Sequence, residues 1–345
     1  MRIIKTDQII LIKMTILALI FIGISLLLYV LLGGADFGAG IIEIFTGKKG
    51  IDIISKAIAP VWEANHIWLI VIIVVLFNAF PEVYSTITLN LHIPIMLVLI
   101  GIIFRGTTFA FRYYDPYEDR SHRVYSFVFK FFSLLTPFFL GITLGAVISG
   151  RITSDPTASF YIRYISPWFN LFSISLGIFV VFLFAFLASV YLIGEVMDEI
   201  TEEIFIKYSK RLLFALVIFG AIVFLSSQWD GVYLLREYFN SWVSITCISI
   251  TTLFLPLFLY FLKNKMTGMA RIIAGAQTTF IIIGWFGSQF PVLIKLKGSS
   301  SLTIYNAVAP EKTLQMMIIA LFVGLALVIP LLVYLLQVFK FSKEK

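Results

Sequence analysis

The sequence has 345 residues and a formal net charge of +7; 60% of the residues are hydrophobic and only 13% are charged. Soluble globular proteins carry about a quarter charged residues, so this composition excludes a soluble domain and predicts an integral membrane protein. The basic residues stand singly or in pairs beside apolar segments, which excludes a nucleic-acid-binding surface.

The first apolar segment follows Arg2, Lys5 and Lys13 and continues beyond the length of a secretory signal without a small-residue cleavage pattern. We therefore expect a retained first helix. Cys247 is the single cysteine, which excludes an internal disulfide, a cysteine-ligated iron–sulfur cluster and the C-x-x-C-H attachment of a c-type haem.

Apolar segments of the length that crosses a bilayer, roughly 20 residues, recur along the sequence. Several of them end near Pro60, Pro81, Pro167 or Pro291, as expected of a residue without an amide donor. We predict an all-α integral membrane protein, a single transmembrane domain over residues 1–345, with two four-helix groups (helices 1–4 and 5–8) and a peripheral ninth helix. The predicted spans are 14–44, 58–80, 87–111, 124–149, 167–192, 211–227, 242–262, 270–291 and 314–339.

The distribution of Lys and Arg predicts the orientation, because cytoplasmic loops retain these residues. The larger set follows helices 1, 3, 5 and 7 or lies in the C-terminal tail: Lys48, Lys49, Lys56, Arg112, Arg120, Arg123, Lys207, Lys210, Arg211, Lys263, Lys265, Arg271, Lys340, Lys343 and Lys345. The smaller set lies on the other side: Arg2, Lys5, Lys13, Arg151, Arg163, Arg236, Lys295, Lys297 and Lys312. We expect the N-terminus outside and the C-terminus in the cytoplasm, although the basic residues before helix 1 favour the reverse. The acidic segment 195–203 then falls in an inside loop, as a solvated surface.

The stretch GGADFGAGIIE lies toward the cytoplasmic end of helix 1. Its residues Asp36, Gly40 and Glu43 share one helix face at i, i+4 and i+7. Gly34 and Gly38 form a G-x-x-x-G pattern, which lets two helix backbones approach closely.

The stretch APVWEANHIWLI opens helix 2 with Trp62, Glu63, Asn65 and His66. Glu63 and His66 share a face at i, i+3. An ionisable residue within a span costs roughly 2.5–3.5 kcal/mol for Asp, Lys or Arg at the centre, so such residues are functional candidates by default. Arg105, before the end of helix 3, falls at the same depth.

Lys130 lies about two turns into helix 4, at roughly 5.4 Å per turn, and joins the same level of ionisable side chains. Two other interpretations of this cluster stay open. Glu63 and Arg105 can form a structural ion pair, with Asn65 bonded to backbone carbonyls of a neighbour. His66 can be a haem or metal ligand, because E-x-x-H is one element of a helical di-iron site, but the sequence lacks the second E-x-x-H of that site.

His92 and His122 stand near predicted helix ends, and we expect no metal site in this chain. The aromatic residues are expected to contact lipid and form interfacial belts rather than stack on a cofactor. The sequence has no Gly-rich phosphate loop, nucleophile elbow or paired zinc-ligand motif, so we expect no catalytic residue in this chain.

Three blocks of the sequence resemble subunit II of the bacterial cytochrome bd-type quinol oxidases. They are YVLLGGADFGAG (29–40), APVWEANHIWLIVIIVVLFNAFPEVYSTI (59–87) continued by LVLIGIIFRGTTFAFR (97–112), and SLTIYNAVAPEKTLQMMIIALFVGLALVIPLLVYLLQVFKF (301–341). Many members of that family have an acid where this chain has Gly33, which weakens any two-carboxylate route through helix 1. Many also read Trp-Asp-Gly-Asn where this chain reads Trp62-Glu63-Ala64-Asn65, so the acid is retained with one more methylene.

The resemblance implies a heterodimer with subunit I in the bacterial cytoplasmic membrane, which oxidises ubiquinol or menaquinol and reduces dioxygen to water. It implies that haems b and d and the quinol-oxidising loop belong to subunit I, and that this chain holds no cofactor except, in some members, a structural quinone. Small accessory subunits and lipid are further expected partners. The leading hypothesis is a supporting subunit with a cytoplasmic proton route through Asp36, Glu63, His66 and Arg105, in which Trp62 and Asn65 are polar support.

Two alternative functions stay open. A secondary transporter would use the glycine-rich break as a discontinuous helix at the membrane midplane, but the break lies near one end of helix 1. A purely structural oxidase subunit would conduct no protons. For the partner interface we expect apolar and aromatic helix faces, with Gly141 and Gly145 of helix 4 as one close contact.

Overall fold

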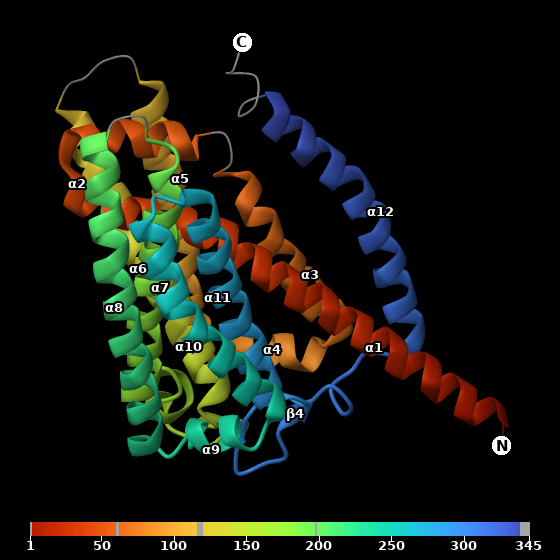
Figure 1. Ribbon diagram of the computed structural model, residues 1–345. Helices are drawn as coiled ribbons and strands as arrows, with labels where there is room; N and C mark the ends of the chain where they lie inside the picture. Colours follow the sequence, from red (N-terminus) through yellow and green to blue (C-terminus); the bar gives the residue numbers. More distant parts are fainter. Residues whose placement is uncertain (1, 60–61, 116–119, 197–198, 339–345) are drawn as a thin grey trace.

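The computed structural model describes residues 2–59, 62–115, 120–196 and 199–338, and most of them are helical (Figure 1). Pro60 and the C-terminal lysines of the orientation argument lie outside the described residues. Eight helices are long and apolar enough to cross a membrane, or nine if the bent pair Ala64–Ala79 and Pro81–Asn90 is one span, among the residues described. The prediction of an all-α, multi-span membrane protein is confirmed.

The first span is one continuous helical stretch. It consists of α1 (Arg2–Leu28), a five-residue π-helical turn η1 (Tyr29–Gly33) and α2 (Gly34–Ile58). The sequence analysis ended this helix at residue 44, so the structure extends it by more than three turns, through the glycines and lysines of TGKKG. Its part with the apolarity of a membrane span is Gln8–Thr46.

The second span is bent sharply. A 3₁₀ turn η2 (Ala64–His66) leads into α3 (Ile67–Ala79), and α4 (Pro81–Asn90) leaves α3 at an angle of 116°. Pro81 occupies the first turn of α4, where its missing amide proton has no helical partner to lose. The sequence analysis placed residues 81–86 in a connection and 87–90 at the start of the third span; the structure makes them one separate short helix.

The remaining elements follow the predicted order. The helices are α5 (His92–Tyr114), α6 (Ser121–Ile148), α7 (Leu171–Ile193), α8 (Glu199–Trp229), α9 (Leu234–Phe239), α10 (Trp242–Lys263), α11 (Thr267–Gln289) and α12 (Glu311–Leu336). Helix α8 begins within the acidic segment that was predicted as a loop. Another π-helical turn, η3 (Tyr161–Ile165), lies between α6 and α7.

Four short strands form two small sheets at the end of the molecule where the chain begins. Strand β1 (Ile152–Thr153) pairs in parallel with β3 (Leu296–Lys297), and β2 (Val292–Ile294) pairs antiparallel with β4 (Leu302–Thr303). The β1–β3 pair ties the segment before α12 to the segment after α6, whereas β2 and β4 both belong to the segment before α12.

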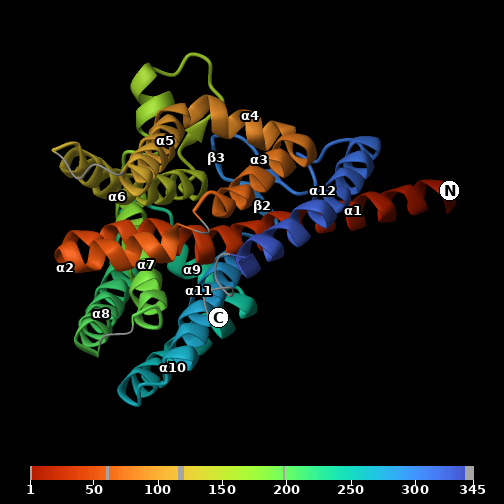
Figure 2. The ribbon, with the colours of Figure 1, turned by 90° about the horizontal axis from the view of Figure 1, so that it is seen from above.

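The helix contacts fall both within and between the two predicted groups. In the first group α1 packs against α3, α2 against α6, and α5 against α6; in the second, α7 packs against α8 and α11, and α10 against α11. Helix α7 joins the groups, because it also packs against α2 and α6. Helix α12 lies outside both groups against α1 and α3, and Figure 2 shows α1 and α12 together on one side of the molecule.

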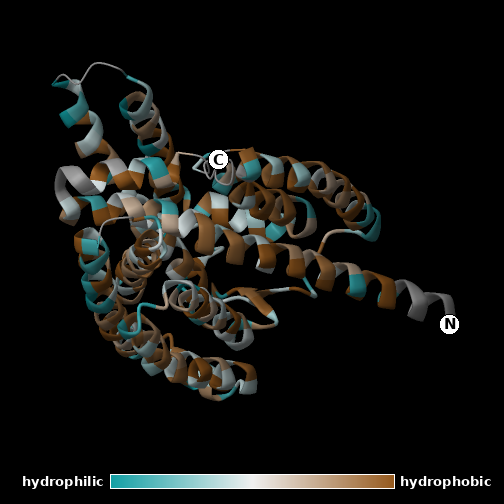
Figure 3. Cartoon of the chain, turned by 45° about the horizontal axis from the view of Figure 1, so that its top comes forward, coloured by the Kyte–Doolittle hydropathy of each residue, from teal (hydrophilic) through white to brown (hydrophobic). Residues whose placement is uncertain are grey.

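Hydrophobic residues cover most of the helix surfaces, and hydrophilic residues gather toward helix ends and loops (Figure 3). In Figure 1 the start of α1 and α4 lie at the lower end of the molecule, whereas the ends of α2 and α12 lie at the upper end. The first span therefore begins on one side of the molecule, and the last helix ends on the other.

Glycines allow the closest approaches between helices. A Cβ atom at Gly38 would lie 1.8 Å from the carbonyl oxygen of Phe184, so α2 and α7 touch through their backbones, as the G-x-x-x-G pattern predicts. Cβ atoms at Gly141 and Gly145 would lie 2.7 Å from the Cα atoms of Gly177 and Ser173 in α7. The prediction that Gly141 and Gly145 contact a partner subunit is wrong, because α7 of the same chain covers them.

Candidate functional site

Two buried ion pairs join α2 to α5, and the first is Asp36 with Arg105. The Nη2 atom of Arg105 donates to Asp36 Oδ1 at 2.7 Å and to the Asp36 carbonyl oxygen at 3.0 Å, while Nε donates to Ser133 Oγ at 3.2 Å. The side chains of Arg105 and Asp36 are only 1% and 2% exposed. Such a pair is stable away from water only because each charge has its partner and further hydrogen bonds.

The second pair, Glu43 with Arg112, lies two turns further along both helices. Arg112 Nη1 donates to Glu43 Oε1 at 2.7 Å and to Oε2 at 2.9 Å, and Nη2 donates to Ser55 Oγ at 3.1 Å. Lys130 Nζ on α6 lies 4.0 Å from Glu43 Oε1. Glu43 therefore has two cations around one buried carboxylate.

The ring of Phe129 links the two pairs. The guanidinium carbon of Arg105 lies 5.0 Å from its centroid and that of Arg112 lies 4.6 Å from it. Cations over an aromatic face gain electrostatic attraction in a desolvated site. The two ion pairs, Asp36–Arg105 and Glu43–Arg112, are spaced by seven residues on both α2 and α5, and we call them the ion-pair ladder. This ladder holds the two helices in register.

The sequence analysis predicted part of this ladder. Asp36, Glu43 and Arg105 all belong to it, as the shared helix face suggested, with Lys130 beside Glu43. Arg112 was counted as a loop cation, whereas it lies in α5 and is 8% exposed. Its seven-residue spacing from Arg105, which matches that of Asp36 and Glu43, is the signal that could have identified it.

The alternative in which Glu63 pairs with Arg105 is contradicted. Glu63 is exposed on the surface of the chain, and among the described residues the ion-pair partner of Arg105 is Asp36. The physical reason is the tight turn at Glu63–His66, which turns the carboxylate outward while the next residues face inward. Glu63 therefore lies at the edge of the cluster and not inside it.

The neighbours of Glu63 hold this turn against the first helical stretch. Asn65 Nδ2 donates to the Leu32 carbonyl oxygen at 3.4 Å, so the prediction that Asn65 bonds a backbone carbonyl is confirmed. The Trp62 ring packs 5.6 Å from the Phe109 ring and 2.9 Å from the position a Cβ atom of Gly106 would take. Both contacts fix the start of α3 against η1 and α5.

His66 points from this turn toward the first helical stretch. Its ring centroid lies 6.2 Å from the Tyr29 ring and 5.9 Å from the Phe37 ring. Asp36 and Arg105 lie close enough to His66 to interact with it electrostatically. The predicted residues Asp36, His66 and Arg105 thus form one cluster, with Glu63 three residues before His66 on the surface.

The three histidines lie in different parts of the chain. Among the described residues no group of three or more His, Cys, Asp or Glu side chains is arranged to hold a metal ion. His92 is exposed and lies edge-on to Tyr164, and His122 lies 3.9 Å from Asp115 at the opposite end of the molecule.

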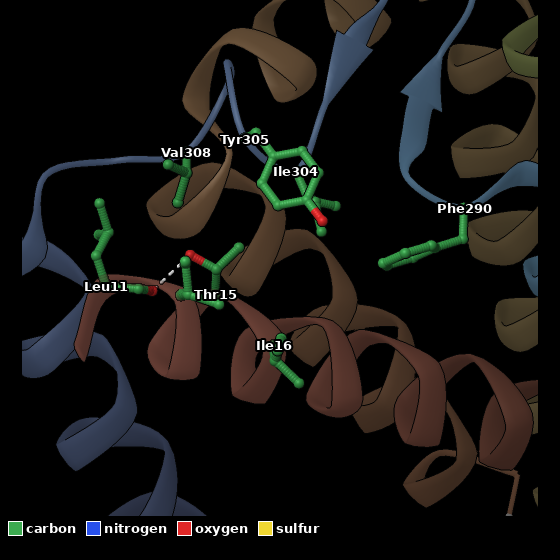
Figure 4. Close-up of a pocket in the computed structure, with 8 residues that line it drawn as sticks. Leu11, Thr15, Ile16, Phe290, Ile304, Tyr305 and Val308 are labelled. Carbon is green, nitrogen blue, oxygen red and sulfur yellow. Dashed lines mark hydrogen bonds between the residues drawn. The ribbon is translucent and has the colours of Figure 1, made fainter. Parts of the chain in front are cut away.

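An apolar pocket of about 100 Å³ lies far from the cluster, between α1 and the loops around the strands (Figure 4). Its lining includes Leu11, Ile16 and Phe290. Thr15 points into it, but its hydroxyl donates to the Leu11 carbonyl oxygen of its own helix at 2.8 Å. The pocket therefore resembles a lipid-facing depression more than a site that orients a polar substrate.

Comparison with known proteins identifies the family. The sequence model of "Cytochrome bd terminal oxidase subunit II" matches residues 14–339. The chain belongs to this family. The resemblance found in the sequence blocks is thereby confirmed, and the chain is a subunit of a quinol oxidase complex, which implies a subunit I partner.

Individual relatives agree with this assignment. The chain is 25% identical over 330 residues to cytochrome bd ubiquinol oxidase subunit 2 of Bacillus subtilis, which covers 94% of each chain. It is 28% identical to cytochrome bd-I ubiquinol oxidase subunit 2 of Escherichia coli K12 over 38% of this chain and 35% of that one. Its fold is similar to a chain of the bd oxidase from Geobacillus thermodenitrificans, with a TM-score of 0.75, 21% identity, and coverage of 95% of this chain and 99% of that chain.

Proposed function

We propose that this subunit supports subunit I of a cytochrome bd-type oxidase and supplies it with protons from the cytoplasm. In this proposal the complex lies in the bacterial cytoplasmic membrane, oxidises quinol and reduces dioxygen to water. Haems b and d lie in subunit I, and this chain contributes no catalytic residue. The structural quinone and the small accessory subunits implied by the sequence resemblance remain predictions.

The distribution of charge supports the orientation in this proposal. The upper end in Figure 1 holds the end of α2, the start of α3 and the end of α5, and the C-terminal helix ends there. Most Lys and Arg residues of the sequence stand in the connections of this side or near the helix ends that lead to them, and the cytoplasmic side retains such residues. With this end in the cytoplasm, Glu63 and both ion pairs lie in the cytoplasmic half of the subunit.

The observation that carries the proton route is a graded burial from the surface to the ion-pair ladder. Glu63 is exposed, His66 is partly buried three residues later, and Asp36 is 4% exposed beside Arg105. A carboxylate at the surface can take a proton from water, and a histidine has an ordinary pKa near neutral pH that suits proton exchange. Transfer from Glu63 through His66 toward Asp36 therefore moves a proton from the surface toward the buried ion pairs.

Replacement of Glu63 by Gln tests this route. The variant keeps the shape and hydrogen-bonding capacity of the side chain and removes its titratable proton. Proton-transfer groups typically contribute about 10²–10⁴-fold to a rate, so we expect quinol oxidation by the purified complex to slow by at least tenfold. Haem content and assembly should not change. Glu63→Asp should retain part of the rate, because the carboxylate remains.

The matched control is Glu82→Gln, since Glu82 is an exposed glutamate in the first turn of α4 at the other end of the molecule. This variant should turn over at the wild-type rate. If Glu63→Gln also assembles normally and turns over at that rate across pH, Glu63 is not an obligatory proton carrier. Loss of haem or of assembly in Glu63→Gln would instead support a structural role.

A purely structural subunit is the second candidate, and the two buried ion pairs favour it. Arg105 and Arg112 each connect α2 to α5 through more than one hydrogen bond, which fits a role in helix register. The two candidate functions make different demands on Glu63, which lies outside the two ion pairs. Only the proton route requires a titratable group at Glu63.

A further inference from the structure

Three buried polar atoms near the Asp36–Arg105 pair have no hydrogen-bond partner among the described protein groups. They are Tyr29 Oη, His66 Nδ1 and Asp36 Oδ2. Tyr29 is 3% exposed and Asp36 is 4% exposed. Buried polar groups are almost always hydrogen-bonded, because an unmade bond in a low-dielectric interior costs about 1–3 kcal/mol.

The contacts of Tyr29, Asp36 and His66 bring these residues into one region of the molecule. Tyr29 and Asp36 lie seven residues apart on one continuous helical stretch, and the π-helical turn η1 lies between them. The ring of Tyr29 extends over Gly33, where two of its carbons lie 3.1 Å from the position of an added Cβ atom, so the ring follows the helix toward Asp36. His66 approaches from η2, with its ring 6.2 Å from that of Tyr29.

The other neighbours leave these atoms without a protein partner. Arg105 occupies Asp36 Oδ1 and leaves Oδ2 unbonded. The Phe37 ring meets His66 edge-on and offers it no acceptor or donor of hydrogen bonds. Asp36 and Arg105 interact electrostatically with both Tyr29 and His66, so the four side chains share one polar environment.

We propose that Tyr29, His66 and Asp36 form a binding site for an ordered water molecule that connects the histidine to the aspartate. The water accepts a hydrogen bond from Tyr29 Oη and donates to Asp36 Oδ2 and His66 Nδ1. Three hydrogen bonds are typical of a buried water. Tyr29 is then a positioning residue, and Gly33 leaves the space in which its ring lies.

This inference deepens the proposed function and rests on it for the proton step. A protonated His66 gives the proton on Nδ1 to the water, and the water gives a proton to Asp36 Oδ2. The histidine returns to its neutral form, the aspartate becomes neutral and the water is unchanged. The step requires no further reactant.

The test is a structure of the purified oxidase complex that resolves waters at other buried polar groups of the same map. We expect density for one water within about 3 Å of all three atoms. The density should disappear in Tyr29→Phe, which keeps the ring and removes the hydroxyl. Turnover should fall about threefold to tenfold, as expected from the loss of one hydrogen bond to a water in the route.

The matched control is Tyr238→Phe, because Tyr238 in α9 is partly buried and packs against Phe224, away from this cluster. It should keep both the density and the rate. If Tyr29→Phe does not assemble, Gly33→Ala serves as the second variant, since the added methyl group forces the Tyr29 ring to shift by a few tenths of an ångström and should weaken the same density.

The inference is overturned if the wild-type map shows the three side chains bonded directly to one another or to subunit I without a water. It is also overturned if the density and the rate survive in Tyr29→Phe. Glu63→Gln separates the two proposals. A wild-type rate in that variant refutes Glu63 as the proton carrier, while density that is present in wild type and lost in Tyr29→Phe still supports the water site.

Discussion

The two halves of the first helical stretch have similar apolar residues and different surroundings. In α1, Ile12, Ile16, Ile20 and Ile24 are all between 45% and 51% exposed, and the helix packs against α3 and the peripheral α12. In α2, Phe37 and its neighbours are buried between α6 and α7.

The difference teaches what specifies helix contacts in a membrane. Lipid chains are as apolar as isoleucine, so apolar residues alone give helices little reason to associate. Helix α2 has glycines that admit a neighbouring backbone and acids that require cations, whereas the glycine of α1, Gly23, has no atom within 4 Å of an added Cβ. The α2 half should therefore tolerate substitution far less than the α1 half.

The largest effect is expected from Arg105→Leu. This change leaves the Asp36 carboxylate buried without its cation, and breaking a buried pair from one side costs about 3–5 kcal/mol. The free energy of unfolding, measured by denaturant titration of the purified complex, should fall by an amount in this range. The double variant Asp36→Leu, Arg105→Leu should recover most of the loss, because no unpaired charge remains.

Arg151→Leu is the matched control for that prediction. Arg151 Nη2 lies 2.8 Å from Asp230 Oδ1, but these side chains are 32% and 17% exposed near a helix end. Partly exposed ion pairs contribute about 0–1 kcal/mol to stability, so Arg151→Leu should lower the free energy of unfolding only slightly. Equal losses in Arg105→Leu and Arg151→Leu would show that burial does not distinguish the two pairs.

The next largest effect is expected from Gly38→Ala. The new methyl group would lie 1.8 Å from the Phe184 carbonyl oxygen, so α2 and α7 must separate, and overpacking of this kind costs about 1–3 kcal/mol. The control Gly23→Ala adds a methyl group in open space and should leave stability unchanged or raise it by up to about 1 kcal/mol through helix propensity. Thermal unfolding of both variants checks the contrast, and a destabilised Gly23→Ala would contradict it.

The sequence predicts which residues of α2 matter, but not all of their partners. The seven-residue spacing of Asp36 and Glu43 fixes their common face, because helix geometry is local. Which cation each acid meets depends on how α2 crosses α5 and on the depth of each helix, and this information is tertiary. For that reason Arg105 was weighed as a partner of Glu63, and Arg112 was assigned to a loop.

Helix ends show the same limit. The segment TGKKG reads as a helix end because glycine weakens helices, yet α2 continues to Ile58. Conversely, Pro81 correctly marks a break, but the sequence does not show that the next ten residues form a helix bent by 116° from α3. In α2, tertiary contacts override the low helix propensity of glycine. At Pro81, the break that local propensity predicts is kept, and tertiary contacts set the angle of the next helix.

The smallest effect is expected from removing a hydroxyl group at either half of the first helical stretch. One hydroxyl group lies against α2 and the other belongs to α1. Ser133 of α6 is fully buried and accepts from Arg105 Nε at 3.2 Å, beside Gly40, whose missing side chain leaves room for it. Ser133→Ala leaves that donor unbonded and should lower the free energy of unfolding by about 1–2 kcal/mol. Thr15 of α1 donates only to a carbonyl of its own helix, so Thr15→Val should change stability by less than about 0.5 kcal/mol. Denaturant titration of the two variants side by side measures the difference, and equal losses would mean that the α1 half is specified by polar contacts as strongly as the α2 half.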